Sequence, residues 1–521
     1  MQTLTAKAAG TGFLRQPLVV PSVLVQRRWS FRLGAKRDRT MTKGGKRKGR
    51  EDQKAPPPEQ PLPGDCLTVD GSMLEGGGQI LRNAAALAAI TGARLKVLDI
   101  RAGRKNPGLR PQHLAGLQLV RDCCQGELLG GAVNSKAMAL LPGSIQGGSY
   151  LADTGTAGSC SLLAQAALPC LLMGRAVSSA HQQQPAPPAA AHASISRISR
   201  HPPQSQNSGP PSAEHNAQPA HQQQNLHACQ EAAGRHVAPD SRERAQQALG
   251  AGSGVSNFDG AAASGPAAGP VWMLELRGGT DASMAPPVGY LQQVVLPSLA
   301  QHFGVNAQLK LLRRGFYPRG GGHAELSGSC LAPGSCLPAV QLVEQGNLTG
   351  VTISAFTAGK LPGTIADRML ATAENWVRKA VGKDVPVHCQ STQETAGGAM
   401  GDGAGLLIVG QTDTGLLLGG TGIGERGKPS EAVAEEAAET FCNAVTTGAC
   451  VDEWLEDQLI IFMALATGRS RMRCQQPTLH TRTAMVVAEQ LTSAKFTVTQ
   501  EKPSLWMVEC QGAAVPAGQQ R

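Results

Sequence analysis

The chain has 521 residues, including 63 Gly and 34 Pro, and aromatic residues supply only 3%. At the usual ~100–200 residues per domain this length predicts about three domains, but the glycine and proline content indicates a smaller folded mass. Residues 1–50 hold 13 Lys or Arg and one Asp and so contribute +12 to the net charge of +10, which disfavours a basic protein that coats DNA. No apolar run is long enough for a membrane span.

Two segments have compositions that do not predict a packed core. Residues 1–62 form a basic extension, in which residues 1–40 are typical of an organelle transit peptide and Lys43–Arg50 of a nuclear address. A solvated tail without function is the alternative. Residues 178–269 are rich in Ala, Gln, His, Ser and Pro, with Phe258 as their single aromatic residue, so we expect a disordered low-complexity insertion. Its seven histidines are irregularly spaced, which favours low complexity over metal binding.

The remaining residues alternate between strand and helix patterns, which predicts α/β layers. Strands are expected at 67–70, 95–102, 271–279, 351–356, 385–391, 406–411, 496–500 and 505–512. Helices are expected at 80–90, 111–124, 159–172, 364–381, 430–444, 452–468 and 483–491. The strand–helix series from about residue 340 is separate from the rest, which indicates one core interrupted by an inserted domain.

The 13 cysteines contain no CxxC pair, and most lie in apolar segments, as Cys160 and Cys170 do. This distribution argues against a zinc ribbon or a disulfide scaffold. It favours reduced, mostly buried thiols in an intracellular compartment. The first residues also lack the pattern of a secretory signal, so we expect none.

A glycine-rich segment at 422–430, GIGERGKPS, matches GxGxxG but is not expected to bind a nucleotide. Pro429 stands where a phosphate loop needs a hydroxyl group for magnesium, and proline has no N–H to offer an anion. We interpret this segment as a tight turn between a strand and a helix.

Four other clusters carry groups suited to phosphate chemistry. In the first, residues 75–82 (EGGGQILR), three glycines precede a helix and leave its N–H groups free for an anion. Glu75 is suited to a divalent cation, and Arg82 to phosphate oxygens. The second, residues 101–113, concentrates Arg101, Arg104, Gln112 and His113 with two further cations on a Gly/Pro loop, which indicates a polyanion such as an RNA end. The alternatives are a glycine-rich turn with surface charges for the first cluster and a solvated loop for the second.

The third cluster is a small-residue turn at 153–159 (DTGTAGS), followed by a helix that carries Gln165. By itself it predicts only a capped helix. The fourth combines Asp457 and Gln458, in an otherwise apolar helix, with His480 at the start of the next helix. A helix N-terminus favours neutral histidine, which keeps a lone pair for attack, and it also favours an incoming phosphate. Asp457 could orient the ring or accept from a ribose, although a lone histidine is usually a satisfied side chain.

Six motifs occur in order across residues 63–512: EGGGQILR, IRAGR…PGLRPQHL, DTGTAGS, RGGT…AP, RRGFYPRGGG and WLEDQL…TLHTRTA. Together they closely resemble the RNA 3′-terminal phosphate cyclase family. The resemblance implies an α/β fold with a large domain of three repeated βαβαββ units, similar to the C-terminal domain of translation initiation factor 3. It places the large domain at 63–177, 270–344 and 446–521, with a smaller inserted α/β domain at 345–445.

The resemblance also implies an activity: ATP-dependent conversion of an RNA 3′-terminal phosphate to a 2′,3′-cyclic phosphodiester, through a histidine–AMP intermediate and an RNA-adenylate. The expected partners are ATP, Mg²⁺ or Mn²⁺, and RNA 3′ ends that bear a phosphate, with no membrane. A non-catalytic relative that acts in ribosomal RNA processing is the alternative, although such relatives lack the histidine; an enolpyruvyl transferase built from similar units is a third possibility. We expect a nuclear enzyme, with a mitochondrion or plastid as the alternative location.

By motif position, His480 matches the histidine that is adenylylated. Glu75 matches a metal-linked carboxylate. The residues that match ATP-binding positions are Gln165, Pro286, Trp454, Asp457 and Gln458, together with His480. Those that match positions around the phosphates and the RNA end are Arg82, Arg101, Arg104, Gln112 and His113. Trp454 departs from the family pattern, which often has Tyr there; indole stacks on adenine equally well, but the phenol hydroxyl is lost.

Overall fold

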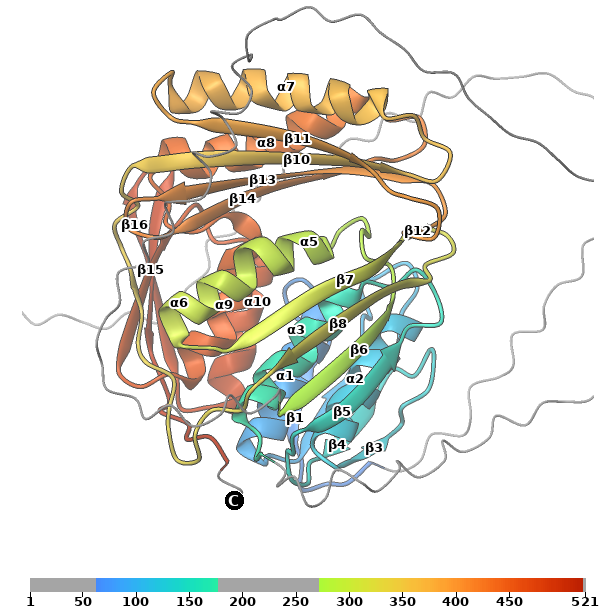
Figure 1. Cartoon of the computed structure of the whole chain (residues 1–521). Coiled ribbons are helices and arrows are strands. Elements are labelled where there is room, and N and C mark those ends of the chain that lie inside the picture. Colours follow the sequence, from blue (N-terminus) through green and yellow to red (C-terminus); the bar gives the residue numbers. More distant parts are fainter. Residues whose placement is uncertain (1–61, 177–270, 519–521) are drawn as a thin grey trace, which may run out of the picture. The chain divides into compact units, whose positions relative to one another are not determined.

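The computed structural model describes residues 62–176 and 271–518 (Figure 1). The low-complexity insertion predicted above lies outside these residues, as does the basic extension except for Leu62. The described part is a mixed α/β fold with four sheets. None of its helices combines the length and the apolar character that crossing a bilayer requires.

The first sheet has the strand order β1-β2-β4-β3. β1 runs parallel to β2, whereas β4 is antiparallel to both β2 and β3. Its elements along the chain are β1 (Leu67–Asp70), α1 (Gly78–Thr91), β2 (Leu95–Leu98), α2 (Pro111–Cys123), β3 (Glu127–Leu129) and β4 (Met138–Leu141). α1 ends at Gly92, whose φ of 72° is left-handed, and α2 begins at Pro111, as their sequences predict.

The second sheet repeats this arrangement. β5 is parallel to β6, and β8 is antiparallel to both β6 and β7. Its elements are β5 (Gly148–Asp153), α3 (Cys160–Met173), β6 (Trp272–Gly278), the continuous helical segment α5 (Val288–Tyr290), η2 (Leu291–Val295) and α6 (Leu296–Phe303), β7 (Ala307–Gly315) and β8 (Gly322–Gly328). The described chain stops at 176 and resumes at 271 beside the first residues of β5 and β6, at the edge opposite to the loop that leads into α3.

The third sheet has the order β16-β17-β15-β9 and the same strand directions. Its elements are β9 (Gln341–Leu342), α9 (Glu453–Leu465), β15 (Arg469–Cys474), α10 (Leu479–Leu491), β16 (Lys495–Lys502) and β17 (Leu505–Gln511). In each of the three sheets the elements therefore follow the order β-α-β-α-β-β along the chain.

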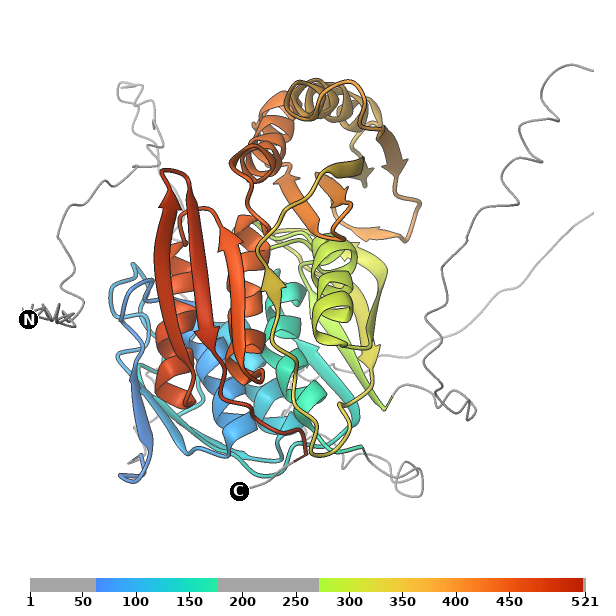
Figure 2. The same ribbon diagram turned by 90° about the vertical axis from the view of Figure 1, so that its left-hand side faces the viewer.

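Between β9 and α9 the chain forms a fourth sheet with an apolar cluster of its own. Its elements are β10 (Leu348–Ala358), α7 (Thr364–Val381), β11 (Val387–Gln393), β13 (Gly403–Thr412), β14 (Leu417–Ile423) and α8 (Ser430–Thr447). Figure 2 shows α7 and α8 together on one face of this sheet. The short strand β12 (Ala399–Met400) pairs with β7 of the second sheet instead. The GxGxxG match connects β14 to α8, and Pro429 is the N-cap residue.

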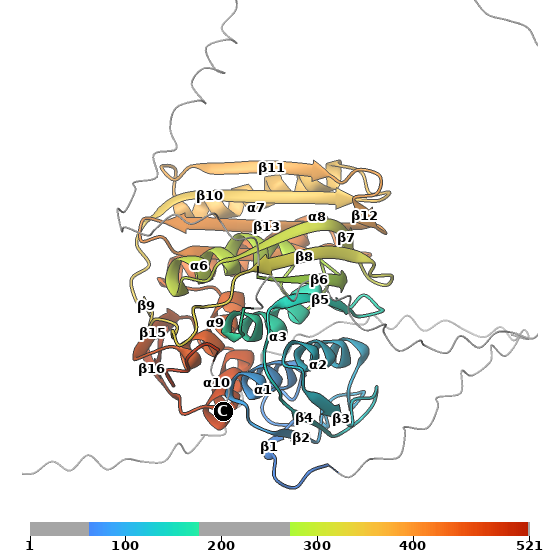
Figure 3. The same cartoon turned by 60° about the horizontal axis from the view of Figure 1, so that its bottom comes forward.

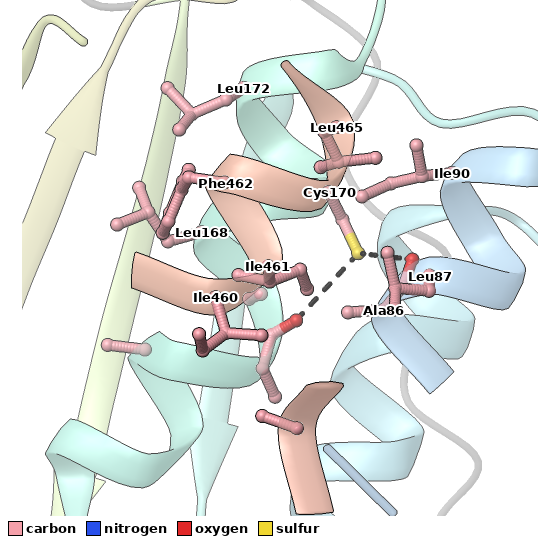
Figure 4. Packing of buried hydrophobic residues seen from close by; sticks show 14 of the residues in the cluster. Ala86, Leu87, Ile90, Leu168, Cys170, Leu172, Ile460, Ile461, Phe462 and Leu465 are labelled. Carbon is pink, nitrogen blue, oxygen red and sulfur yellow. Dashed lines mark hydrogen bonds between the residues drawn. The ribbon is translucent and has the colours of Figure 1, made fainter. Parts of the chain in front are cut away.

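The main core lies among the helices that the first three sheets surround (Figure 3). α1 packs against α2, α3 and α10, and α9 packs against α10. Small buried side chains such as Ala84 and Ala88 let these helices approach closely. In Figure 4, Leu87 of α1, Leu168 of α3 and Ile461 of α9 meet around Cys170, one of several buried free thiols. This packing brings the first turns of helices from three different sheets into one region.

Each strand and helix predicted from the sequence is present; β1 and α7 have the predicted ends, and the ends of the others are shifted. The sequence pattern did not predict the helical segment at 288–303 or the strands β3, β4, β5, β7, β8, β9, β12, β14 and β15. Most of these strands are short or follow glycine-rich turns. This helical segment has a π-helical turn at Leu291–Val295, and Pro297 follows in the first turn of α6. Both features obscure the 3.6-residue period.

Candidate active site

The turn before α1 leaves the first N–H groups of that helix without a cap from any described side chain. Gly77 is the N-cap residue, and a side chain there would collide with the Glu75 carboxylate. A side chain at Gly78 would meet the ring of His113 and the guanidinium of Arg82. The glycines therefore let these three groups close around the positive end of the helix, which favours an anion.

Glu75 connects this turn to two other parts of the site. Its carboxylate pairs with Arg104, which also donates a hydrogen bond of 2.7 Å to the Glu75 carbonyl oxygen. Its backbone N–H donates to Thr483 Oγ1, on α10, at 3.4 Å. The second carboxylate oxygen, Oε2, is buried and has no partner among the described residues. A buried oxygen left in this state is suited to a cation or a donor from a ligand.

The guanidinium of Arg82 connects α1 to α3 directly and to α9 through Gln79. Its Nε donates to Gln165 Oε1, on α3, at 2.9 Å, and another nitrogen donates to Gln79 Oε1. Gln79 in turn donates to Asp457 Oδ2, on α9, at 3.3 Å. Burial lowers the pKa of Arg82 to about 10, against the opposing charges of Asp457 and Glu75, and leaves it cationic at neutral pH.

Burial raises the pKa of Asp457 to about 8, although Arg82 opposes this shift. At neutral pH this carboxyl group is therefore largely protonated and can both donate and accept. Its hydrogen-bond partner is Gln79, and no described hydrogen bond joins it to His480. The idea that Asp457 orients the imidazole thus has no support in the described contacts, whereas a hydrogen bond to a ribose hydroxyl stays open.

His480 is the second residue of α10 and lies in its first turn. Thr478 caps the helix, accepting from the Thr481 N–H at 3.1 Å. The pKa of His480 is lowered, chiefly by desolvation; Glu75 opposes the shift, and the charges of Arg82 and Arg104 add to it. The imidazole is therefore neutral at pH 7. It lies close to the cationic side chains of Arg82 and Arg104, which border the turn before α1.

The loop before α2 holds the second cluster. Gln112 Oε1 accepts from the Ser159 N–H at 2.9 Å, which ties this loop to the start of α3. His113 Nδ1 accepts from the Arg110 N–H at 3.3 Å. A cavity between α1, α2 and α3 is lined by Arg82, Gln112 and His113. The structure thus brings three of the residues expected around a phosphate to one cavity.

Two predicted residues make hydrogen bonds within their own segments, and a third joins two segments. Arg101 donates to the carbonyl oxygens of Asn106 and Gly108, and so it stabilises its loop. Gln458 donates to the Trp454 carbonyl oxygen, one turn earlier in α9, while the indole packs against the main core. The remaining member, Pro286, accepts from Ser161 Oγ of α3 at 2.6 Å.

Comparisons with known proteins identify the family. A family model described as RNA 3′-terminal phosphate cyclase matches residues 73–181 and 245–498. The chain belongs to this family. An RNA 3′-terminal phosphate cyclase of Drosophila melanogaster is 32% identical over 446 residues, which cover 86% of this chain and 96% of the relative. The cyclase of Pyrobaculum aerophilum is 30% identical, with 86% and 98% covered, and a probable cyclase of Dictyostelium discoideum is 30% identical, with 85% and 82% covered.

Two further residues of the candidate site were not predicted from the sequence. Gln79 links Arg82 to Asp457, and Glu456 holds the start of α10: its Oε1 accepts from the Thr478 N–H at 2.7 Å and from the Thr481 hydroxyl. Both stand beside residues that the motifs did select. No group of three or more metal-ligating side chains lies in residues 62–176 and 271–518.

Replacing Glu456 with alanine is expected to destabilise the protein by about 2–4 kcal/mol, because two buried donors lose their acceptor. Burial raises the pKa of Glu456 to about 7, so the neutral Glu456→Gln variant resembles a form that the protein already populates. It keeps an acceptor oxygen and should lose less than about 1 kcal/mol. Urea denaturation of both variants at pH 7 checks this, and equal losses would contradict it.

His113 predicts a pH-dependent part of the stability. Burial, with the charges of Arg82, Arg101 and Arg110, lowers its pKa to about 3. Below about pH 6.5 the unfolded chain binds a proton at this site that the folded protein does not. The free energy of unfolding therefore decreases as the pH is lowered, by about 2 kcal/mol at pH 5. In His113→Gln this part should vanish. Urea denaturation at pH 7.5 and 5.0 measures it, and an unchanged difference between the two pH values would refute the assignment.

Proposed function

We propose that the chain is an ATP-dependent RNA 3′-terminal phosphate cyclase that works through a covalent histidine–AMP intermediate. The observation that carries this proposal is a neutral, accessible imidazole at the start of α10, close enough to Glu75, Arg82 and Arg104 for their charges to act on it. A nucleophile close to two cations is suited to attack on a phosphate. Membership of the cyclase family supports the same chemistry.

In the first step the lone pair of His480 attacks the α-phosphorus of ATP. A P–N bond forms, the P–O bond to the β-phosphate breaks, and pyrophosphate leaves with its electron pair. Arg82 and Arg104 offset the negative charge that develops on the leaving group. The covalent intermediate divides a difficult transfer into two easier ones.

Five residues are assigned to ATP in this proposal: Gln165, Pro286, Trp454, Asp457 and Gln458. Two of them belong to the Arg82 network, Gln165 directly and Asp457 through Gln79. The indole of Trp454 is suited to stacking on adenine. The protonated Asp457 carboxyl group can exchange hydrogen bonds with a ribose hydroxyl.

Glu75 would hold the divalent cation, Mg²⁺ or Mn²⁺. Its unpartnered Oε2 fits this role, because magnesium sites often use one carboxylate together with substrate phosphates. Bound there, the cation would supply charge neutralisation on the triphosphate. The other carboxylate oxygen pairs with the Arg104 guanidinium.

In the second step an oxygen of the RNA 3′-phosphate attacks the phosphorus of the histidine–AMP; a P–O bond forms and the P–N bond breaks. The neighbouring 2′-hydroxyl then loses its proton to solvent, and its oxygen attacks the 3′-phosphorus. A new P–O bond forms, the anhydride P–O bond to AMP breaks, and AMP departs from the resulting 2′,3′-cyclic phosphodiester. Arg101, Arg104, Gln112 and His113 are assigned to the RNA end. Holding the hydroxyl beside the activated phosphate gives the ring closure a high effective molarity.

The proposal is tested by incubating the full chain with α-labelled ATP and Mg²⁺ or Mn²⁺. The protein should acquire label that is stable to alkali and labile to acid, as a phosphoramidate is. A chase with RNA 3′-phosphate should convert the label to AMP and give a cyclic RNA end. No label on the protein would instead favour a non-catalytic relative that acts in RNA processing.

The domain arrangement is part of the proposal. We assign the three β-α-β-α-β-β series to repeated units of one large domain, built from residues 63–177, 270–344 and 446–521. Residues 345–445, with their own apolar cluster, are assigned to the inserted small domain. The basic run Lys43–Arg50 suggests a nuclear location, with an organelle as the alternative. Imaging of tagged chains that start at Met1 and at Met41 distinguishes them.

A further inference from the structure

Three loops of the second sheet lie at the same edge as the candidate site. β5, β6 and β7 run in the same direction, because β5 is parallel to β6 and both β6 and β7 are antiparallel to β8. The segments that follow these strands, residues 154–159, 279–287 and 316–321, therefore meet at one edge of the sheet. The first leads into α3 and the second contains Pro286. We call this group the edge loops.

The edge loops contact one another and Gln112. A side chain at Gly320 would collide with the Thr156 carbonyl oxygen, so the turn between β7 and β8 packs directly on the first loop. The Gly279 N–H donates to the Gly158 carbonyl oxygen at 2.7 Å, which joins the first loop to the second. The next residue along, Ser159, donates to Gln112 at 2.9 Å. The turn is thus separated from the residues assigned to the RNA end by a single loop.

The edge loops expose side chains that the fold does not use. Tyr317 is 84% exposed and Met284 is 90% exposed, and Arg319 is also exposed. None of these side chains makes a hydrogen bond or an ion pair within the part of the chain that the structure describes. Nearby acidic groups have partners: Asp153 accepts from the Gly155 N–H, and Glu425 accepts from Ser283 Oγ. An aromatic ring and a cation thus lie open to solvent beside the site.

We propose that the edge loops bind the single-stranded nucleotides that precede the terminal one in the RNA, with a base stacked on Tyr317 and a phosphate near Arg319. This inference rests on the proposed function and names the part of the substrate that the site residues do not reach. Single-stranded RNA is bound by exposed aromatic side chains and neighbouring cations, and stacking tolerates any base. The loops that border Gln112 are a surface onto which an RNA chain can leave the site. The contact should therefore raise affinity for longer RNA without sequence preference.

The test compares binding of a nucleoside 3′-phosphate and an octanucleotide 3′-phosphate, without ATP so that no reaction occurs. For Tyr317→Ala the dissociation constant of the octanucleotide should rise about tenfold, the loss expected for one stacked base. The nucleoside 3′-phosphate should bind within about twofold of its original affinity. Tyr317→Phe keeps the ring and should behave as the unaltered protein does. Trp376→Ala, which removes a partly exposed aromatic residue from α7, serves as the matched control.

Arg319→Ala should weaken octanucleotide binding and reduce its dependence on salt by about one phosphate contact. Equal octanucleotide affinity for Tyr317→Ala and the unaltered protein overturns the inference, as does an equal loss for the nucleoside 3′-phosphate. Labelling by α-labelled ATP separates the two proposals. If Tyr317→Ala is labelled normally and binds the octanucleotide normally, the proposed function stands and only this inference fails. A protein that takes no label and binds neither RNA overturns both.

Discussion

Replacing His480 with alanine is expected to abolish labelling by α-labelled ATP and to reduce cyclisation by at least about 10⁴-fold, as loss of the nucleophile does in other enzymes with covalent intermediates. The alanine removes the one protein atom that bonds to AMP in the proposed mechanism. Stability should change little, because His480 is exposed and the start of α10 is held by Thr478 and Glu456. Autoradiography of the protein and analysis of the RNA ends measure the two effects.

His388→Ala is the matched control, because this histidine is exposed on β11 in the small sheet. It should take label and cyclise RNA as the unaltered protein does. Label that persists in His480→Ala would place the nucleophile elsewhere. Label lost from both variants would indicate damage to the fold rather than to the chemistry.

The helices of the site could be predicted because their ends carry local signals. Gly92 stops α1, Pro111 starts α2, and Thr478 precedes α10. These signals act through one or two residues and survive any packing arrangement. They were enough to place His480 at a helix start and Arg82 one turn inside another.

The strands of the second and third sheets were harder to predict. β7 and β8 enclose RRGFYPRGGG, whose glycines and proline suggested a motif rather than a hairpin. β15 alternates Arg with buried residues, and its burial depends on β17, which lies about thirty residues later. Long-range pairing of this kind leaves little local trace.

The site was predictable only in its chemistry. The motifs selected Arg82, Gln165 and Asp457, but not the amide of Gln79 that connects the first to the third. In the sequence Gln79 resembles any polar residue at a helix start, and its burial arises from the packing of α1 against other helices. Glu456 likewise resembles a solvent-facing carboxylate until α10 packs beside it. Arg101 shows the converse: a cation expected on phosphate is engaged with its own loop.

Replacing Arg82 with methionine is expected to reduce labelling by α-labelled ATP by about 10²–10³-fold, the loss typical of one group that stabilises charge in a transition state. Arg82→Lys keeps a charge but replaces the planar fork that reaches Gln165 and Gln79 together, so most of this loss should persist. Rates of labelling at saturating ATP distinguish this from weaker binding.

The pH dependence of the free energy of unfolding tests whether the Arg82 charge acts on Asp457. The pKa of Asp457 is raised to about 8 with Arg82 opposing the shift, so Arg82→Met should raise it further. A carboxyl group whose pKa is higher in the folded than in the unfolded protein contributes its full stabilisation below the unfolded pKa, which is about 4. This contribution is lost as the pH rises through the folded pKa. In Arg82→Met the free energy of unfolding should therefore keep falling above pH 8, whereas Arg82→Lys should level off there. Parallel curves for the two variants would show that Arg82 does not act on Asp457.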